Sequence, residues 1–277
     1  MAFFLRSITL ATLFVSLTAL ANAQEPKPEM ASEVEQTKTS APVAPAQEYY
    51  ELRTYKITDI DNQEKVERYL ADALLPALNR MNVDRVGVFT STSDVNDHSI
   101  YMLIPYKDLA TFTGMNTTLA ADAVYQEAAK SYFDQPKKKP LYKRIESRFM
   151  KAFESMPVIE PPAQTANKEP RIFELRLYQS HTEDHARRKV QMFNTGETQL
   201  MRDCEMAPVF FGETLIGPEA PNLIYMLSAS DDKAHKAHWQ KFLKGDRWAK
   251  MKVLPEYKDT VSKIKNWFLV PTAYSQL

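Results

Sequence analysis

The chain has 277 residues, 44% apolar and 25% charged, which is enough to bury a core in two domains of about 100 residues each. Its 35 basic residues balance its 35 acidic ones. This balance argues against a nucleic-acid-binding protein, which needs a basic surface to meet the phosphate backbone. Only six glycines are present, and none follows the spacing of a phosphate-binding loop.

The N-terminal residues have the pattern of a secretory signal peptide. Arg6 supplies a positive start, an uncharged apolar run covers residues 8–20, and Ala21-Asn22-Ala23 fits a cleavage site. A membrane anchor is the less favoured alternative, because the run is shorter than the ~20 residues that a span needs. We therefore predict cleavage after Ala23 and a periplasmic or secreted protein without a membrane span in its mature chain.

Composition divides the rest of the chain into two halves. Residues 24–47 are rich in Ala, Pro, Glu, Lys and Thr and contain no aromatic residue, which predicts a disordered linker. A second, proline-rich linker covers residues 154–169. The domains are therefore predicted at residues 48–153 and 170–277. Because the chain has one cysteine, Cys204, it cannot form an intrachain disulfide, and a packed core must hold the fold.

Two short segments recur and indicate that the halves are copies of one domain. Residues 50–55 (YELRTY) correspond to residues 173–178 (FELRLY), at an offset of 123 positions. Residues 100–103 (IYML) recur as residues 224–227, at an offset of 124. Two matching segments in the same order, at nearly the same offset, indicate a duplicated domain.

Each half predicts the order strand, helix, strand, strand, helix, strand. In the first half we expect strands at residues 50–55, 86–90, 100–104 and 145–153, a helix from Asp61 kinked at Pro76, and a helix over 109–133 interrupted near Gly114 and Asn116. In the second half we expect helices over residues 182–206, 231–242 and 247–253, and strands at residues 173–178, 209–216, 223–228 and 261–270. This order predicts the α+β class, with two tandem ferredoxin-like (βαββαβ) halves. Because each half leaves one face of its sheet bare, we expect the two sheets to cover each other in a barrel with the helices outside.

The duplicated strand carries a polar face in both halves, formed by Glu51, Arg53, Tyr55, Glu174, Arg176 and Tyr178. We expect Leu52 and Leu175 to face the helices, which would place the polar residues in a structural network between the two sheets. The alternative is catalysis, with a glutamate as base and an arginine as anion clamp. The occurrence of the pattern in both halves favours the structural role.

The halves differ in the helix that follows this strand. At an offset of 124, Leu70 and Ala73 correspond to Asn194 and Glu197, and the helical wheel places both polar residues beside Phe193 on the stripe that faces the core. A buried amide and carboxylate need partners or water. Asn194, Glu197 and Phe193 are therefore candidate ligand-binding residues. The alternative is that the polar pair satisfies only local groups.

Tryptophan and histidine are the other candidates for a site. All three tryptophans lie in the second half, and we predict that Trp239 and Trp248 line the same cavity; a purely structural role in the core is the alternative. Two histidine pairs, His181/His185 and His235/His238, have spacings that can bring two imidazoles to one metal. Neither pair has a clear third ligand, so we predict no metal site and no cofactor. No catalytic triad can be assigned from the spacing, and a protein that is not an enzyme is favoured.

Several segments resemble one family. Residues 50–55 and 173–178 resemble the opening strand of NIPSNAP domains. The segments MFNTGE (192–197), PVFFGE (208–213), PNLIYML (221–227) and FLVPTAYS (268–275) are similar to exported bacterial NIPSNAP-family proteins. The resemblance covers residues 49–277 and implies an intrachain dimeric α/β barrel. That superfamily includes cofactor-independent monooxygenases, haem-handling enzymes and non-enzymatic proteins, and this branch has no settled catalytic residues.

Together these observations predict an exported protein that binds a small organic ligand in a helix–sheet cavity of its second half. One alternative is a monooxygenase-like or haem-handling enzyme that uses the same cavity. Another is a non-catalytic protein-interaction module. Nucleic acid is not an expected partner, and assembly into a homo-oligomer is left open.

Overall fold

The computed structural model describes residues 46–94 and 96–277. The predicted signal peptide and all but two residues of the predicted N-terminal linker lie outside this part of the chain. Between residues 46 and 277, the described residues contain no helix long and apolar enough to cross a membrane.

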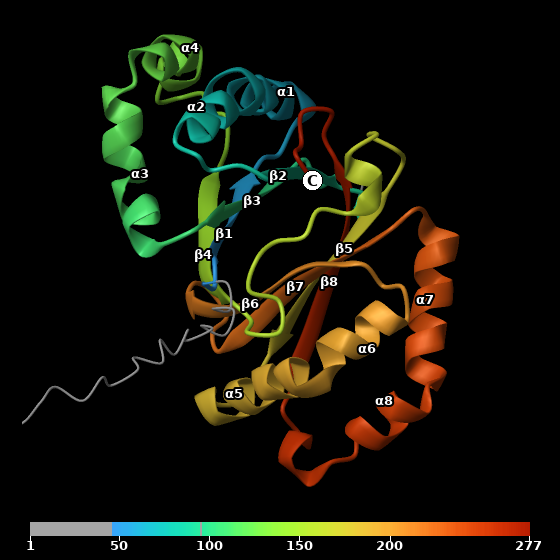
Figure 1. The fold of residues 1–277 in the computed structure, drawn as a ribbon. Coiled ribbons are helices and arrows are strands. Elements are labelled where there is room, and N and C mark those ends of the chain that lie inside the picture. Colours follow the sequence, from blue (N-terminus) through green and yellow to red (C-terminus); the bar gives the residue numbers. More distant parts are fainter. Residues whose placement is uncertain (1–45, 95) are drawn as a thin grey trace, which may run out of the picture. The chain divides into compact units, whose positions relative to one another are not determined.

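Strands from both halves form one closed antiparallel barrel (Figure 1). Its strands are β1 Tyr49–Lys56, β2 Gly87–Ser91, β3 Ile100–Tyr106, β4 Arg144–Ala152, β5 Ile172–Gln179, β6 Pro208–Ile216, β7 Asn222–Ala229 and β8 Lys263–Pro271. Their order around the barrel is β1-β3-β2-β8-β5-β7-β6-β4, with β4 pairing again with β1. The halves join where β2 pairs with β8 and β4 pairs with β6. The predicted fold class is confirmed, since the two βαββαβ halves close a barrel within one chain.

Helices cover the outside of each half (Figure 1). The first half contributes α1 Ile60–Tyr69, a π-helical turn Leu70–Leu74, α2 Leu75–Arg80, α3 Leu109–Ala121 and α4 Ala123–Phe133. The second half contributes α5 Glu183–Met192, a π-helical turn Phe193–Glu197, α6 Thr198–Asp203, α7 Asp232–Lys244 and α8 Asp246–Met251. The wide turn precedes Pro76 in the first half, where a kink is predicted. The second half has the same turn without a proline, so Pro76 does not by itself create it.

The predicted interruption near Gly114 and Asn116, in the helix expected over residues 109–133, is wrong. Helix α3 runs through both residues, and the break comes at Asp122. The Asp122 carboxylate accepts a hydrogen bond from the backbone N–H of Tyr125 at 3.0 Å and so caps α4. A capping side chain therefore ends one helix and starts the next here, whereas one glycine costs a helix only about 1 kcal/mol.

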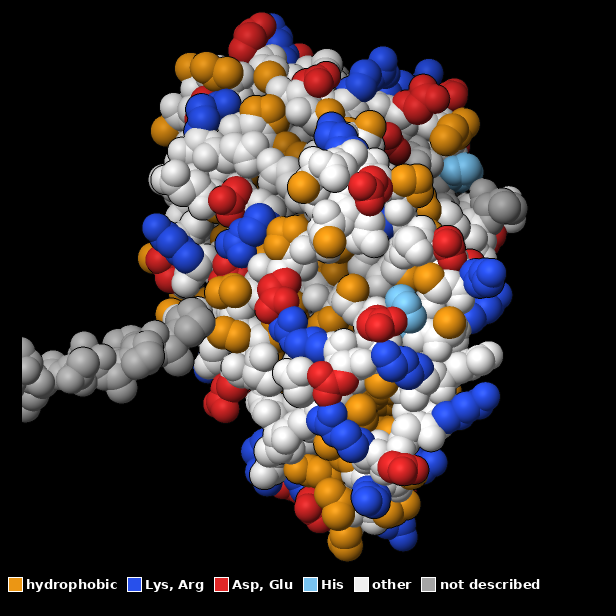
Figure 2. Space-filling view, turned by 45° about the vertical axis from the view of Figure 1, so that its right-hand side comes forward, with side chains coloured by type: hydrophobic (Ala, Val, Ile, Leu, Met, Phe, Trp, Pro, Cys, Tyr) orange, Lys and Arg blue, Asp and Glu red, His pale blue; other side chains and the backbone are white. Residues whose placement is uncertain are grey.

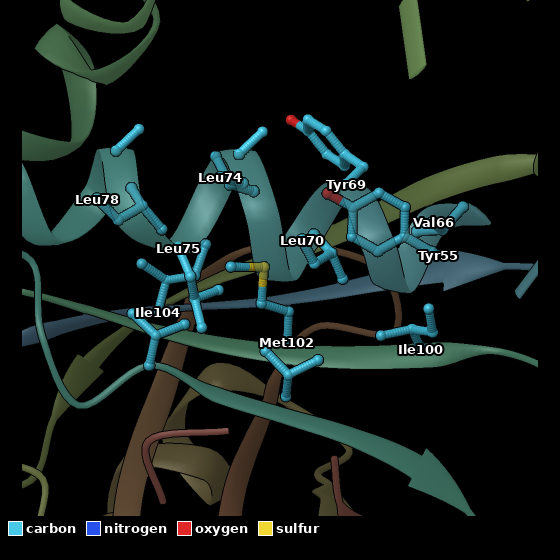
Figure 3. Packing of buried hydrophobic residues seen from close by; sticks show 14 of the residues in the cluster. Tyr55, Val66, Tyr69, Leu70, Leu74, Leu75, Leu78, Ile100, Met102 and Ile104 are labelled. Carbon is cyan, nitrogen blue, oxygen red and sulfur yellow. The ribbon is translucent and has the colours of Figure 1, made fainter. Parts of the chain in front are cut away.

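Three apolar clusters make up the core. One fills the barrel and contains Leu52 and Leu175. The other two lie between the barrel and the helices of each half. Figure 3 shows the cluster of the first half, in which Leu70 and Leu75 point from the helical segment toward Met102 and Ile104 of β3. The prediction that Leu52 and Leu175 face the helices is therefore wrong.

The proline-rich linker between the halves packs onto the barrel. Met156 and Ile159 are buried, and Ile159 belongs to the cluster that fills the barrel. The backbone N–H of Ile159 donates to the Glu48 carboxylate at 2.8 Å, and Arg85 pairs with the same carboxylate at 2.7 Å. This segment thus contributes to the core instead of separating two independent bodies.

The surface carries mixed charge. Figure 2 shows acidic and basic side chains interspersed over the face in view, with no stripe of one sign. This distribution matches the balance of 35 basic and 35 acidic residues. Long-range attraction of a polyanion to this face is therefore weak.

Candidate functional site

The polar face of β1 is turned toward the helices of the first half. Glu51 is 3% exposed and accepts hydrogen bonds from Arg53 Nε at 3.0 Å and Arg53 Nη2 at 2.9 Å. Ser147 Oγ donates to it at 2.5 Å and Tyr106 Oη at 3.0 Å. Tyr106 Oη also lies 3.3 Å from Met115 Sδ in α3. Every lone-pair direction of the carboxylate therefore has a donor, which is what a buried charge requires.

The second half repeats the network with different donors. Glu174 accepts from Arg176 Nη1 at 2.5 Å and from Asn266 Nδ2 at 3.0 Å. His235 Nε2 and Trp239 Nε1, both on α7, lie 2.8 Å from its other oxygen. The prediction of a network between the two sheets is therefore wrong for Glu51, Arg53, Tyr55, Glu174, Arg176 and Tyr178. The barrel interior around Leu52 and Leu175 is mainly apolar, and the donors that these glutamates need lie on the outer side of the sheets.

These contacts shift the acidity of both glutamates. Burial alone would raise the pKa of Glu174. The hydrogen bond from His235, the charge of Arg176 and the hydrogen bonds from Trp239 and Asn266 together outweigh burial and lower the pKa to about 2. Burial and Arg53 oppose each other in the same way at Glu51, and its pKa is also lowered. The lowered pKa makes each carboxylate a weak proton acceptor, and its oxygens are already occupied by donors, so neither is suited to act as a general base.

Glu174 should make stability depend on pH. Its pKa is lower in the folded chain than in the unfolded one, so its stabilisation is present above pH 4.5 and is lost as the pH falls toward 2. We expect the free energy of unfolding of the wild type to fall, between these pH values, by about 3 kcal/mol more than that of Glu174→Gln. Urea denaturation followed by circular dichroism at several pH values measures this difference. Glu127→Gln, which removes an exposed carboxylate, is the control, and equal pH dependence of the wild type and Glu174→Gln would contradict the prediction.

The register between the halves differs from the predicted one. The helix N-caps Asp59 and Thr182 and the two π-helical turns are 123 positions apart. The strands agree: Leu52 pairs with Leu103, and Leu175 pairs with Met226. The offset of 124, used to align the helices and to match the IYML segments, is therefore one residue out of register. At the correct offset, Glu197 corresponds to Leu74 and Asn194 to Ala71.

The polar residues of the second-half helix are paired within the protein. Lys189 and Glu197 are both buried, with Lys189 Nζ 2.7 Å from Glu197 Oε2. The ammonium lies 4.7 Å from the centre of the Phe193 ring. Burial raises the pKa of Glu197, because desolvation outweighs the attraction of Lys189. Asn194 Oδ1 accepts a hydrogen bond from the backbone N–H of Ser155 at 3.1 Å.

The predicted site of the second half is filled by its own side chains. The centre of the Trp239 ring lies 4.5 Å from the Arg176 guanidinium carbon, and the ring centres of Trp248 and Phe242 are 4.7 Å apart. Five pockets in residues 46–94 and 96–277 have walls that contain none of the predicted ligand-binding residues Phe193, Asn194, Glu197, Trp239 and Trp248. Whether these five residues bind a ligand stays a prediction.

A cavity of about 570 Å³ lies instead in the first half, between the end of the sheet and α3, α4 and the segment that follows them. Tyr69 Oη and Tyr125 Oη are 2.9 Å apart in its wall, and the Tyr69 and Tyr132 rings are stacked with centres 3.7 Å apart. The cavity is lined by Arg53, Tyr55, Tyr69, Leu74, Met115, Asn116, Leu119, Tyr125, Tyr132, Phe133, Gln135, Pro136, Lys137, Pro140, Leu141, Tyr142, Lys143, Arg144 and Ile145. Its volume is within the range of small-molecule sites.

Three substitutions between the halves fall on the wall of the cavity. Helices α3 and α7 have the same length, and their N-caps Asp108 and Asp231 are 123 positions apart. At this offset, the cavity residues Asn116, Leu119 and Tyr125 correspond to Trp239, Phe242 and Trp248. The second half therefore carries a larger side chain, and an aromatic one, at each of the three positions. Side-chain volume therefore contributes to the difference between the halves, and the covering helix differs as well, since α4 has 11 residues and α8 has 6.

Neither histidine pair forms a metal site in the described residues. His235 is held by Glu174, whereas His238 Nε2 lies 3.9 Å from Glu205. The rings of His181 and His185 approach edge to face with centres 5.9 Å apart. Across residues 46–94 and 96–277, no group of three or more His, Cys, Asp or Glu residues is arranged to hold a metal ion.

Sequence reasoning missed the partners of the two glutamates and the tyrosine-lined cavity. Tyr106, Ser147, His235 and Asn266 lie 55, 96, 61 and 92 positions from the glutamates that they contact. No local pattern connects such distant residues. The cavity had one signal in the sequence, since tyrosines concentrate in the first half and all three tryptophans lie in the second.

Comparison with solved structures shows the same barrel in other proteins. A "putative monooxygenase" from Lactobacillus acidophilus matches with a TM-score of 0.53 and 10% identity over 81% of this chain and 94% of that one. A "putative monooxygenase" from Fusobacterium nucleatum matches with a TM-score of 0.51 and 9% identity over 82% and 93%. An uncharacterized NIPSNAP-like domain protein from Burkholderia xenovorans is 19% identical over 38% of this chain and 88% of its own, with a TM-score of 0.35. At 9% and 10% identity, the first two matches show the fold alone.

Comparison of the sequence itself gives the family. No curated protein matches the chain. The NIPSNAP family model matches it twice, at residues 50–157 and 173–276, so the two matches fall in the two halves of the barrel and cover most of the chain. The chain therefore belongs to the NIPSNAP family.

Proposed function

We propose that the protein binds a small organic ligand in the helix–sheet cavity of its first half. The observation that carries this proposal is a cavity of about 570 Å³ whose wall combines tyrosine rings with the partly buried guanidinium of Arg53. An apolar wall with a few fixed polar groups is the usual composition of a small-molecule site. The duplication adds support, because the second half fills the corresponding space with its own aromatic side chains.

The predicted location in the second half is the less favoured one. There, Glu197 is bound by Lys189, and Trp239 covers Arg176. A ligand would have to displace a buried ion pair or an indole ring to enter. Binding in the first half needs no such rearrangement, since side chains leave a cavity of about 570 Å³ there.

Filling the cavity should weaken ligand binding. Asn116→Trp places in the first half the ring that Trp239 places in the second, and we expect it to weaken ligand affinity at least about tenfold, or 1.4 kcal/mol. Thr117→Trp adds the same ring to an exposed neighbouring position that does not line the cavity, and should bind as the wild type does. A thermal-shift screen of small aromatic, aliphatic and acidic compounds supplies ligands, and calorimetric titration compares the variants.

The outcomes of that titration separate the functions. Equal loss in both variants would point to unfolding of α3 and not to a blocked site. Binding that survives Asn116→Trp would place the ligand elsewhere and contradict the proposal. Absence of any ligand in the screen would favour the non-catalytic interaction module.

A second candidate is an oxygen-dependent reaction on the bound ligand. It is favoured by the two neighbours named "putative monooxygenase", which match more than four-fifths of this chain. The cavity would shield a reactive aromatic substrate from water. An oxygen electrode tests this by measuring consumption when a ligand from the screen is added to the wild type and to Asn116→Trp. Equal rates in the two proteins would leave binding as the function.

We also propose that the protein acts after export, because residues 1–23 have the composition of a cleaved leader. N-terminal sequencing of the protein recovered from cells should then begin at Gln24. A protein that begins at its first residue would contradict export by this route.

A further inference from the structure

The second half shows how an aromatic ring can bind beside the arginine of the duplicated strand. The Trp239 ring lies over the Arg176 guanidinium, with 4.5 Å from the guanidinium carbon to the ring centre. Its indole N–H donates to Glu174, which also binds Arg176. A ring at this distance from a cation is attracted through its electron-rich face, and arginine adds a flat surface for stacking.

The first half keeps the arginine but lacks the ring. Arg53 and Arg176 occupy the same register: Arg53 pairs with Met102 and Ser147, and Arg176 pairs with Tyr225 and Asn266. Each arginine is bound by the glutamate two residues before it. Asn116 stands at the position of Trp239, however, and within the described residues Arg53 has no cation–π contact. Arg53 is instead part of the cavity wall.

The mouth of this cavity is basic. The exposed residues Lys137, Lys143 and Arg144 line the mouth, Arg53 lies deeper in the wall, and no Asp or Glu lines the cavity. Within residues 46–94 and 96–277, none of the first three forms an ion pair. Arg53 is neutralised by Glu51, so the uncompensated positive charge is at the mouth and not in the depth. A ligand with an acidic group would therefore place that group at the mouth.

We infer that the ligand of the first half is a planar aromatic acid. Its ring stacks on the Arg53 guanidinium, as the Trp239 indole stacks on Arg176, and its carboxylate lies among Lys137, Lys143 and Arg144. Tyr69 and Tyr132, already stacked on each other, border the ring. This inference rests on the proposed function, since it names the class of ligand for the same cavity.

Three probes of nearly equal size test the two parts of this assignment by calorimetric titration of the wild type. Naphthalene-2-carboxylate is planar and acidic, decahydronaphthalene-2-carboxylate is acidic but not flat, and naphthalene-2-carboxamide is flat but uncharged. We expect the naphthoate to bind tightest. Loss of the aromatic face should weaken binding about tenfold. Loss of the charge should weaken it about threefold, and the difference between acid and amide should shrink in 0.5 M salt, about three times the physiological ionic strength.

Two variants assign these effects to residues. Arg53→Lys keeps the charge beside Glu51 but removes the flat surface, and should abolish the preference for naphthoate over its saturated analogue. Lys137→Gln should weaken the naphthoate about twofold and leave the carboxamide unchanged. Circular dichroism confirms that each variant is folded. If Arg53→Lys does not fold, the comparison of probes in the wild type still decides the question.

The outcomes also separate this inference from the proposed function. If the saturated acid binds the wild type as tightly as the naphthoate, and Asn116→Trp blocks both, the cavity is a ligand site but the aromatic assignment is wrong. If the carboxamide binds as tightly as the acid, the basic mouth does not select the ligand. If none of the three probes binds, the assignment is overturned, while another ligand from the screen that Asn116→Trp blocks would keep the proposed function.

Discussion

Replacing Glu197 with leucine should lower the free energy of unfolding by about 3–5 kcal/mol, although leucine is apolar and the site is buried. The substitution leaves the Lys189 ammonium in the core without its carboxylate. An unpaired buried charge costs far more than the new apolar contacts return. Urea denaturation at pH 7 measures the change.

The corresponding residues of the first half supply the control for this prediction. Lys189 and Glu197 stand where the first half has Val66 and Leu74, so the double variant Lys189→Val/Glu197→Leu copies a pair that already packs in this fold. We expect it to regain wild-type stability or exceed it, because apolar replacement of a buried ion pair is often neutral or stabilising. If the double variant loses as much free energy of unfolding as the two single variants together, the two side chains do not interact.

The barrel could be predicted from the sequence because it follows from the duplication. A βαββαβ half buries only one face of its sheet against helices, and a second copy in the same chain is the nearest cover for the other face. The orientation of β1 and β5 could not be predicted in the same way. Alternation shows that the two faces of a strand differ, but both faces here carry aromatic or aliphatic residues beside polar ones. Which face meets the helices depends on donors such as His235 and Asn266, far along the chain.

The alignment that led to the predicted site was one residue out of register. The IYML segments match at an offset of 124, yet the strands that contain them correspond at 123, so that Met102 and Tyr225 are equivalent. A shift of one residue exchanges the two faces of a strand. In the helices it paired Glu197 with Ala73 instead of Leu74, and it hid the ion pair with Lys189. At the correct offset, the contrast between Asn116 and Trp239 points to the first half.

Removing the Trp239 ring should turn the second half into a ligand site. Trp239→Ala deletes the ring that covers Arg176 and one donor to Glu174, and we expect it to lower the free energy of unfolding by about 3 kcal/mol, near the lower limit for tryptophan because the ring is only partly buried. Added indole should restore most of this loss. At a hundred times its dissociation constant, a ligand specific for the folded state contributes about 2.7 kcal/mol. Thermal unfolding of Trp239→Ala with and without indole measures the recovery.

The recovery should depend on the contacts that Trp239 makes. 1-Methylindole has the same aromatic face but cannot donate to Glu174, so it should restore less stability than indole. Trp248→Ala is the matched control, because Trp248 is also partly buried but packs on Phe242 instead of an arginine. Indole should restore less of the stability that this variant loses. Thermal unfolding of the wild type with indole measures any stabilisation that comes from binding in the first half. Only the stabilisation of a variant that exceeds this wild-type value is evidence for binding over Arg176. Equal stabilisation of all three proteins would show that the space over Arg176 is not a site. Selective rescue of Trp239→Ala would show directly that the arginine of the duplicated strand binds a free aromatic ring.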